Sequence, residues 1–120
     1  MRWFFLGILG SFLAGGAFAA DLSDYSAKRL LGPCIEGDND SRDGAVLELE
    51  CEQFIRGFTE AFLILTEGGG SDVCLPPPGN RADEIRWALM RWGAAHHRQL
   101  HVNAGEALLE TFRTEFACEP

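Results

Sequence analysis

The amino-acid sequence predicts an all-α protein, a small disulfide-braced bundle of about four helices. Apolar residues recur at steps of three and four through most of the chain, which is the spacing of one helix face. No alternating run of β-branched residues is bounded by an Asn-Gly or Asp-Gly turn, so no β-hairpin is expected. Four cysteines are available to reinforce the limited core of a 120-residue chain: Cys34, Cys51, Cys74 and Cys118.

Residues 1–19 have the pattern of a cleaved signal peptide. Met1-Arg2 gives a positive start, residues 3–13 form an apolar run, and residues 17–19 (Ala-Phe-Ala) form a small-x-small cleavage site. The run is short for a bilayer span and no positive stop-transfer cluster follows it, so no stable membrane anchor is expected. Residues 20–120 are then one exported domain in an oxidising compartment, where disulfides persist.

The balance of charge restricts the class of partner. The formal net charge is −8, and it becomes −9 once the predicted signal peptide, with its single arginine, is removed. Nucleic acid and anionic lipid repel such a surface, so neither is an expected partner. A basic protein partner is compatible with this charge, although an acidic surface also simply keeps a small exported protein soluble.

The first predicted helix runs from Asp21 to Leu31, with Ser23 as its N-cap. Gly32-Pro33 is expected to end it, because proline cannot continue the hydrogen-bond ladder and disfavours helix in the residue before it. Residues 36–44, which include three aspartates, then form a polar and flexible connector.

The second predicted helix has the clearest periodicity. Its apolar face comprises Leu47, Cys51, Phe54, Phe58, Ala61, Phe62 and Leu65. Gly57 costs helix stability in the middle of this segment, which favours a close approach of another helix there. Glycines 68–70 end the pattern.

Two further helices follow the proline-rich corner at residues 76–78. Asn80 is the predicted cap of the third, with Asp83 and Glu84 complementing the helix dipole. Its predicted buried stripe is Ile85, Ala88, Leu89, Trp92 and Ala95. The fourth begins with a capping box from Asn103 to Glu106 and buries Leu108, Leu109, Phe112 and Phe116.

Four cysteines allow three pairings. Cys74 shortly precedes the third helix and Cys118 follows the fourth, so antiparallel helices would bring these two cysteines to the same end. That geometry favours the pairs Cys34–Cys51 and Cys74–Cys118. A Cys51–Cys74 link would instead require the glycine segment to fold back along the second helix.

No enzyme signature emerges from the motifs. His97 and His101 have helical spacing, but the zinc-protease pattern needs a glutamate after the first histidine and Arg98 stands there, so a solvated histidine turn is expected. The aspartates of the connector lack the closing glutamate of a calcium loop. Gly68-Gly69-Gly70 lacks the lysine of a phosphate loop. Neither a metal nor a cofactor is expected.

Three residues are candidates for contact with a protein partner. Glu67 and Asp72 flank the three glycines, and loops on a rigid scaffold commonly carry recognition. Trp87, five residues from Trp92 on the third helix, is expected to be partly exposed, and tryptophan is enriched at binding hot spots. The turn from His96 to Val102 is the competing surface, because its histidines and arginine offer hydrogen-bond donors. A homodimer is also compatible with the sequence.

Three motifs resemble the Rap/Tai immunity proteins. A cysteine opens a helix with an aromatic-aliphatic-x-glycine core at Cys51–Phe58, a Cys-Leu-Pro corner follows at residues 74–76, and an aromatic-x-cysteine closes the chain at 116–118. The resemblance spans Cys34 to Cys118. It implies a small, mainly helical periplasmic protein that binds and blocks a peptidoglycan-cleaving amidase delivered by type VI secretion.

The predicted function is therefore non-enzymatic inhibition, in which a rigid helical surface places a loop over the catalytic cleft of a cell-wall hydrolase. The alternative is a periplasmic stress chaperone, which would respond to acid through protonation of its many carboxylates. An envelope-assembly factor without a toxin partner is a further alternative.

Overall fold

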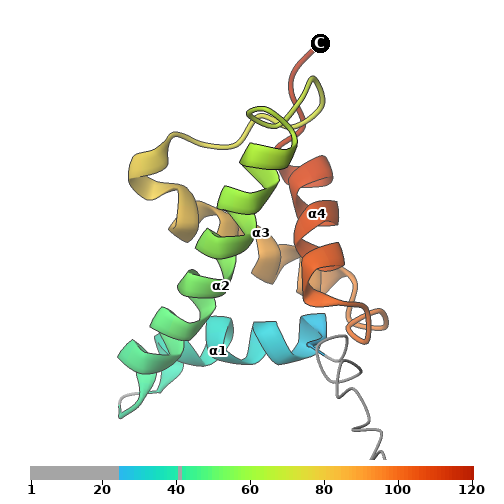
Figure 1. The fold of residues 1–120 in the computed structure, drawn as a ribbon. Coiled ribbons are helices and arrows are strands. Elements are labelled where there is room, and N and C mark those ends of the chain that lie inside the picture. Colours follow the sequence, from blue (N-terminus) through green and yellow to red (C-terminus); the bar gives the residue numbers. More distant parts are fainter. Residues whose placement is uncertain (1–24, 41) are drawn as a thin grey trace, which may run out of the picture.

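A computed structural model describes residues 25–40 and 42–120, and it confirms the all-α fold class. The described chain forms α1 (Ala27–Asn39), α2 (Gly44–Leu65), the short 3-10 helix η2 (Pro78–Asn80), α3 (Arg81–Ala95) and α4 (Ala104–Glu115). α1 lies across one end of the molecule, α2 and α4 rise from it, and α3 runs behind them (Figure 1). The predicted signal peptide, residues 1–19, lies outside the described residues. Within the described ranges, none of the helices has both the length and the hydropathy that a membrane crossing requires.

The first helix begins and ends later than the sequence predicted. Ser26 caps it, and the helix continues through Pro33 to Asn39. Ser23, the predicted cap, lies outside the described residues. A proline inside a helix removes one hydrogen bond from the ladder. Leu30 and Cys34, on either side of Pro33, are fully buried, and α1 packs most extensively against α2. Tertiary packing therefore outweighs the local cost of the proline.

The predicted flexible connector at residues 36–44 is wrong, because most of it belongs to helices. Asp38 lies in the last turn of α1, and only residues 40–43 separate the two helices. Asp40 Oδ1 accepts hydrogen bonds from the backbone N–H groups of Asp43 and Arg42, each at 2.8 Å. These bonds hold the pKa of Asp40 below its usual value. The acidic residue thus organises a tight turn.

The buried face of α2 is rotated from the predicted one. Cys51, Ile55 and Thr59 form its fully buried row, and the phenylalanines of the predicted face are only half-buried. Ala61 and Leu65, predicted to be buried, are exposed. The close helix approach predicted at Gly57 is also wrong: this residue is exposed, and an added Cβ would meet nothing within 4 Å. Nothing in the structure explains Gly57.

The core draws side chains from all four helices. Phe112 of α4 lies at its centre, with ring centroids 5.7 Å from Phe58, 5.1 Å from Phe62 and 6.4 Å from Phe116. These rings join α2 to α4. The largest fully buried apolar residues are Phe112, Leu30, Ile55, Ile85, Leu89 and Leu108.

The predicted stripes of the last two helices are largely confirmed. Ile85, Ala88, Leu89 and Trp92 are buried on α3, whereas Ala95 is exposed because it ends the helix. On α4 Leu108 and Phe112 are buried, and Leu109 and Phe116 are half-buried. Asn103 caps α4 by accepting a hydrogen bond from the N–H of Gly105 at 2.8 Å. Asn80 precedes α3 as predicted, but its side chain makes no capping hydrogen bond.

Both predicted disulfides are present. Cys34–Cys51 joins α1 to α2, and Cys74–Cys118 joins the segment before α3 to the segment after α4. The second bridge lies beside an antiparallel contact between Val73 and Ala117. The predicted pairing of the cysteines is therefore confirmed, although the start of α3 itself lies on the other side of α2 from the end of α4 (Figure 1).

Candidate partner-binding site

The glycine loop, residues 66–72, has a defined backbone that depends on its glycines. Gly68, Gly69 and Gly70 all have positive φ, at 94°, 107° and 68°, and Glu67 before them has φ 52°. Residues with a side chain rarely adopt a positive φ, whereas glycine does so readily because it has no Cβ to clash with the backbone. At Gly69 the space is closed as well, because a Cβ would lie 2.4 Å from the carbonyl oxygen of Val73. The glycines thus shape this loop rather than merely interrupting a helix.

Hydrogen bonds hold the loop at both ends. Thr66 Oγ1 donates to the carbonyl of Phe62 at 2.6 Å and accepts from the N–H of Gly69 at 2.9 Å. At the other end the N–H of Cys118 donates to the carbonyl of Asp72 at 3.0 Å, and the N–H of Cys74 donates to Phe116 at 2.8 Å. Together with the Cys74–Cys118 bridge, these contacts fix the loop at one end of the molecule, close to the carboxyl terminus (Figure 1).

Exposed apolar residues stand directly before this loop. Ile64 is 75% exposed and Leu65 is 83% exposed, in the last turn of α2. Glu67 and Asp72 are exposed beside them. We call Ile64, Leu65 and residues 66–72 the loop surface. An apolar centre with a charged rim is the composition of a protein-binding patch. Sequence reasoning missed its apolar part, because the helical period placed Leu65 in the core and did not single out Ile64.

The histidine turn lies at the opposite end of α4 from the loop surface. α3 ends at Ala95, so His97 and His101 do not share a helix face, and both are exposed. His96 is half-buried: its ring stacks on Trp92 at 4.8 Å, and its Nδ1 donates to the carbonyl of Trp92 at 2.8 Å. The expected solvated turn is confirmed for two of the three histidines, while His96 serves as a cap.

Trp87 lies on α3 and is 43% exposed, as predicted, but it is not part of the loop surface. Its ring lies 5.2 Å from the guanidinium of Arg86, a residue that sequence reasoning did not single out. Arg86 is buried, and its Nη1 donates to Asp38 Oδ1 at 3.2 Å and to the carbonyl of Cys34 at 3.4 Å. Its Nη2 donates to Asp83 at 3.2 Å and lies 3.9 Å from Glu48.

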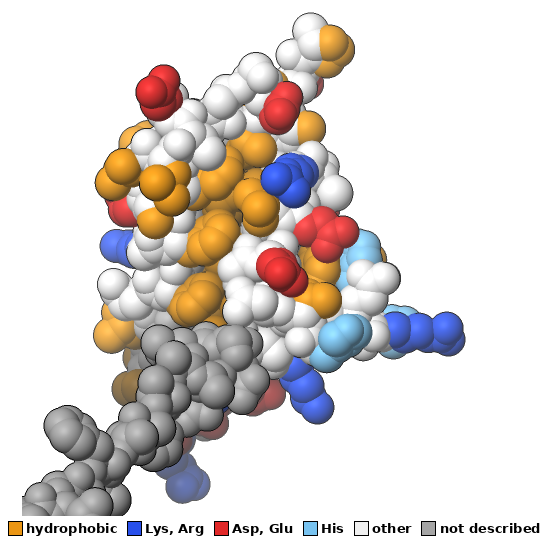
Figure 2. Space-filling view, turned by 45° about the vertical axis from the view of Figure 1, so that its right-hand side comes forward, with side chains coloured by type: hydrophobic (Ala, Val, Ile, Leu, Met, Phe, Trp, Pro, Cys, Tyr) orange, Lys and Arg blue, Asp and Glu red, His pale blue; other side chains and the backbone are white. Residues whose placement is uncertain are grey.

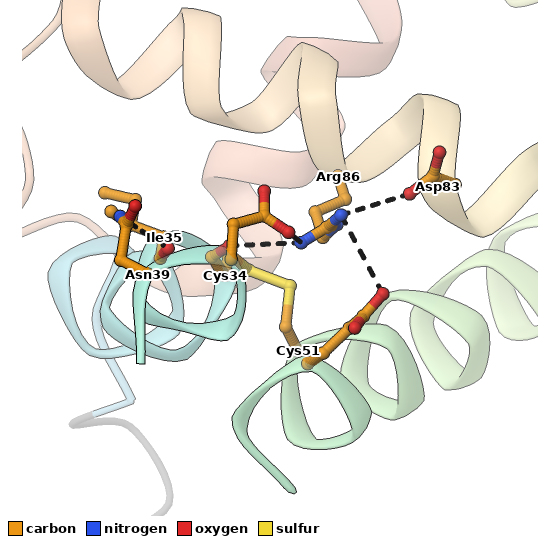
Figure 3. A network of polar contacts seen from close by, with 8 residues as sticks. Cys34, Ile35, Asn39, Cys51, Asp83 and Arg86 are labelled. Atoms are coloured by element: carbon orange, nitrogen blue, oxygen red, sulfur yellow. Dashed lines mark hydrogen bonds and ion pairs between the residues drawn. A yellow bond between two sulfur atoms is a disulfide. The ribbon is translucent and has the colours of Figure 1, made fainter. Parts of the chain in front are cut away.

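Arg86 therefore connects α1, α2 and α3 beside the Cys34–Cys51 bridge (Figure 3). Burial alone would lower the pKa of Arg86, but hydrogen bonds and charges from Asp38 and Asp83 raise it above its usual value. The surrounding carboxylates thus favour the charged form of the guanidinium. The sequence shows only that Arg86 is a charged residue next to the buried stripe of α3. Its partners on α1 and α2 become adjacent only in the tertiary fold.

One group of carboxylates has spacing that a metal ion could use. Oxygen atoms of Glu48, Glu52 and Asp83 lie within 4.8 Å of one another. Arg86 pairs with two of them, and Arg56 lies 3.6 Å from Glu52. Because arginines already neutralise this group, the arrangement is that of an ion-pair network, and we assign it no metal.

Hydrophobic side chains also form a strip along the side of the molecule where α2 and α4 face each other (Figure 2). Half-buried aromatic residues contribute to the cluster at this α2–α4 contact: Phe58, Phe62 and Phe116. Acidic and basic side chains border the strip (Figure 2).

These features define a small helical protein, cross-linked by two disulfides, with a braced loop and an apolar patch at one end. Comparison with known protein families shows to which family the chain belongs. Residues 26–118 match the family of Rap1a immunity proteins, and the chain belongs to that family. Neither the curated proteins nor the solved structures include a significant match to this chain.

Proposed function

We propose that this chain is a periplasmic immunity protein, without catalytic activity of its own, that binds a secreted peptidoglycan amidase and blocks its active site. The observation that carries the proposal is membership of the Rap1a immunity protein family over residues 26–118. Disulfide bonds support an oxidising compartment. The predicted signal peptide and the resemblance to periplasmic inhibitors of type VI effectors narrow that compartment to the periplasm.

The loop surface is the proposed site of contact. A catalytic cleft is concave, so an inhibitor that blocks it must present a convex segment whose shape is already fixed. The glycine loop satisfies this requirement, because its hydrogen bonds and the Cys74–Cys118 bridge limit the conformational entropy lost on binding. Ile64 and Leu65 supply apolar area, and Glu67 and Asp72 supply charge for a basic rim on the enzyme.

The proposed function is tested with the mature chain, residues 20–120, and purified candidate amidases, beginning with any encoded beside it. We expect a complex with sub-micromolar affinity for one amidase and loss of its peptidoglycan cleavage at equimolar inhibitor. Absence of such a complex with every candidate would reject the immunity role. Protection of unfolded client proteins at low pH would then favour the chaperone alternative.

The contact site is tested by substitutions on the loop surface. Replacement of both Ile64 and Leu65 by alanine is expected to weaken the amidase complex by about tenfold or more, since central apolar contacts in hot spots are each worth more than about 1 kcal/mol. Folding should be unaffected, because both side chains are exposed. Val46 and Leu49, exposed near the other end of α2, provide the matched control pair. Equal losses in both double variants would move the contact away from the loop surface.

The acidic residues should act mainly on the association rate. We expect Glu67→Gln with Asp72→Asn to slow association with a basic amidase surface and to reduce its salt dependence, because charges at the rim of an interface steer encounter. Replacing Glu106 and Glu110, exposed on α4, by glutamine changes the net charge equally and serves as the control. An unchanged association rate in the loop variant, measured by stopped-flow fluorescence, would reject the role of Glu67 and Asp72.

A further inference from the structure

The two disulfides differ in their access to solvent. Cys34 and Cys51 are both at 0% exposure, between α1 and α2. Cys74 is exposed and Cys118 is half-buried. The carboxyl terminus, two residues after Cys118, projects away from the helices (Figure 1). A reagent dissolved in water therefore meets the second bridge in the native fold, whereas it meets the first only when the helices separate.

Two backbone hydrogen bonds accompany the exposed bridge. After α4 ends, the N–H of Cys74 donates to the carbonyl of Phe116 at 2.8 Å, and the N–H of Cys118 donates to the carbonyl of Asp72 at 3.0 Å. Water competes for such bonds, so each contributes little on its own. Chain ends fray unless they are tied down. The sulfur–sulfur bond is thus the strong tie between the end of the chain and the glycine loop.

Core packing would keep the helices together when this bond opens. Val73 is 4% exposed and belongs to the hydrophobic core. The ring centroid of Phe116 lies 6.4 Å from that of Phe112 on α4. These apolar contacts hold both neighbours of the bridge against the bundle. Opening the bridge should therefore loosen residues 66–72 and 117–120 without separating α2 from α4.

We propose that Cys74–Cys118 is a site of thiol–disulfide exchange with a dithiol, such as the Cys-x-x-Cys pair of a protein reductase, and that this exchange sets the rigidity of the glycine loop. A thiolate of the dithiol attacks Sγ of Cys74, the more exposed residue, and forms a mixed disulfide. Cys118 leaves as a thiolate and takes up a proton. The second thiolate of the dithiol then attacks the dithiol's own sulfur in the mixed disulfide, and Cys74 is released and protonated. Two electrons and two protons pass to the bridge, and the dithiol becomes a disulfide.

The consequence for a partner rests on the proposed function. A loosened loop must be ordered when it binds, so reduction should weaken the amidase complex. Linked equilibria are reciprocal, so a bound amidase should shift the reduction equilibrium toward the disulfide by the same factor.

The exchange site is tested without any enzyme, by treating the folded mature chain with dithiothreitol. Samples are alkylated with iodoacetamide at intervals and mapped by mass spectrometry. We expect Cys74 and Cys118 to be alkylated at least about tenfold faster than Cys34 and Cys51, because attack on an exposed bond needs no unfolding. Circular dichroism should show that the selectively reduced chain stays helical. Equal rates at the two bridges, or a faster reaction of Cys34 and Cys51, would overturn the proposal.

Two double variants measure each bridge alone. Cys34→Ala with Cys51→Ala leaves the exposed bridge, and Cys74→Ala with Cys118→Ala leaves the buried one. Low concentrations of urea should hardly change the reduction rate of the exposed bridge. The same concentrations should accelerate reduction of the buried bridge, because α1 and α2 must first separate. An equal dependence on urea would show that the exposed bridge also opens only through unfolding, which contradicts the proposal.

The two proposals can fail separately. Selective reduction without any amidase complex would remove the proposed function and leave the exchange site. An amidase complex of equal affinity for the oxidised and the selectively reduced chain would keep the inhibitor and disprove control of the loop by the bridge.

Discussion

Replacing Arg86 with methionine is expected to lower the free energy of unfolding by about 3 kcal/mol. Removing one member of a buried ion pair costs about 3–5 kcal/mol, because it leaves the partner charges uncompensated. The lower end applies here, since Asp38, Glu48 and Asp83 are each about 40% exposed and regain hydration once the guanidinium is gone. Chemical denaturation monitored by circular dichroism measures the loss.

Arg91→Met is the matched control on the same helix. Arg91 lies 3.3 Å from Glu115, but its side chain is 60% exposed, so its loss should change the free energy of unfolding by less than about 1 kcal/mol. Arg86→Lys should also be destabilised, because one ammonium cannot reach partners on three helices as the planar guanidinium does. Equal stability of the Arg86→Met and Arg91→Met variants would contradict the role assigned to Arg86.

The pH dependence of this contribution follows from the raised pKa of Arg86. A group whose pKa is higher in the folded state stabilises the fold fully below its unfolded pKa, and that stability is lost only as the pH rises through the folded value. For arginine both values lie far above neutrality. The difference between Arg86→Met and the parent should therefore be constant from neutral pH to moderately alkaline pH.

Local signals predicted the helices well but their boundaries less well. The fold class, both disulfides and the cap at Asn103 followed from apolar periodicity, cysteine placement and capping chemistry. The end predicted at Gly32-Pro33 failed because proline is a local penalty, whereas the packing of Leu30 and Cys34 that overcomes it is tertiary. The sequence shows the cost of a proline in a helix, but the packing that offsets this cost is visible only in the folded structure.

The face of α2 was misplaced for a related reason. Apolar periodicity predicts the large aromatic residues at the centre of the buried stripe, yet Phe58 and Phe62 are only half-buried and pack against Phe112 of α4. The smaller Cys51, Ile55 and Thr59 form the buried row. This rotation exposes Leu65, so the same geometric fact contributes to the apolar patch before the glycine loop.

The Cys74–Cys118 bridge is expected to matter for stability and for recognition. The linked residues are 44 apart in sequence, and in the chain-entropy model a loop of that length corresponds to about 4 kcal/mol. Replacing both cysteines with alanine should lower the free energy of unfolding by that amount. The Cys34–Cys51 bridge, with a separation of 17, should contribute about 3 kcal/mol by the same model.

The two bridges should differ more strongly in local effects than in overall stability. Cys74 and Cys118 fix the end of the glycine loop through the hydrogen bonds from Cys74 to Phe116 and from Cys118 to Asp72. Without this bridge the amides of those two positions should exchange with solvent faster at native pH, and affinity for an amidase should fall because the loop must be ordered on binding. Removing Cys34–Cys51 is the control, since it lies between α1 and α2 beside Arg86 and should leave loop exchange unchanged while both proteins remain folded. Equal exchange at positions 74 and 118 in the two double variants would show that the bridge does not brace the loop, and the rigid-loop basis of the proposed inhibition would then be wrong.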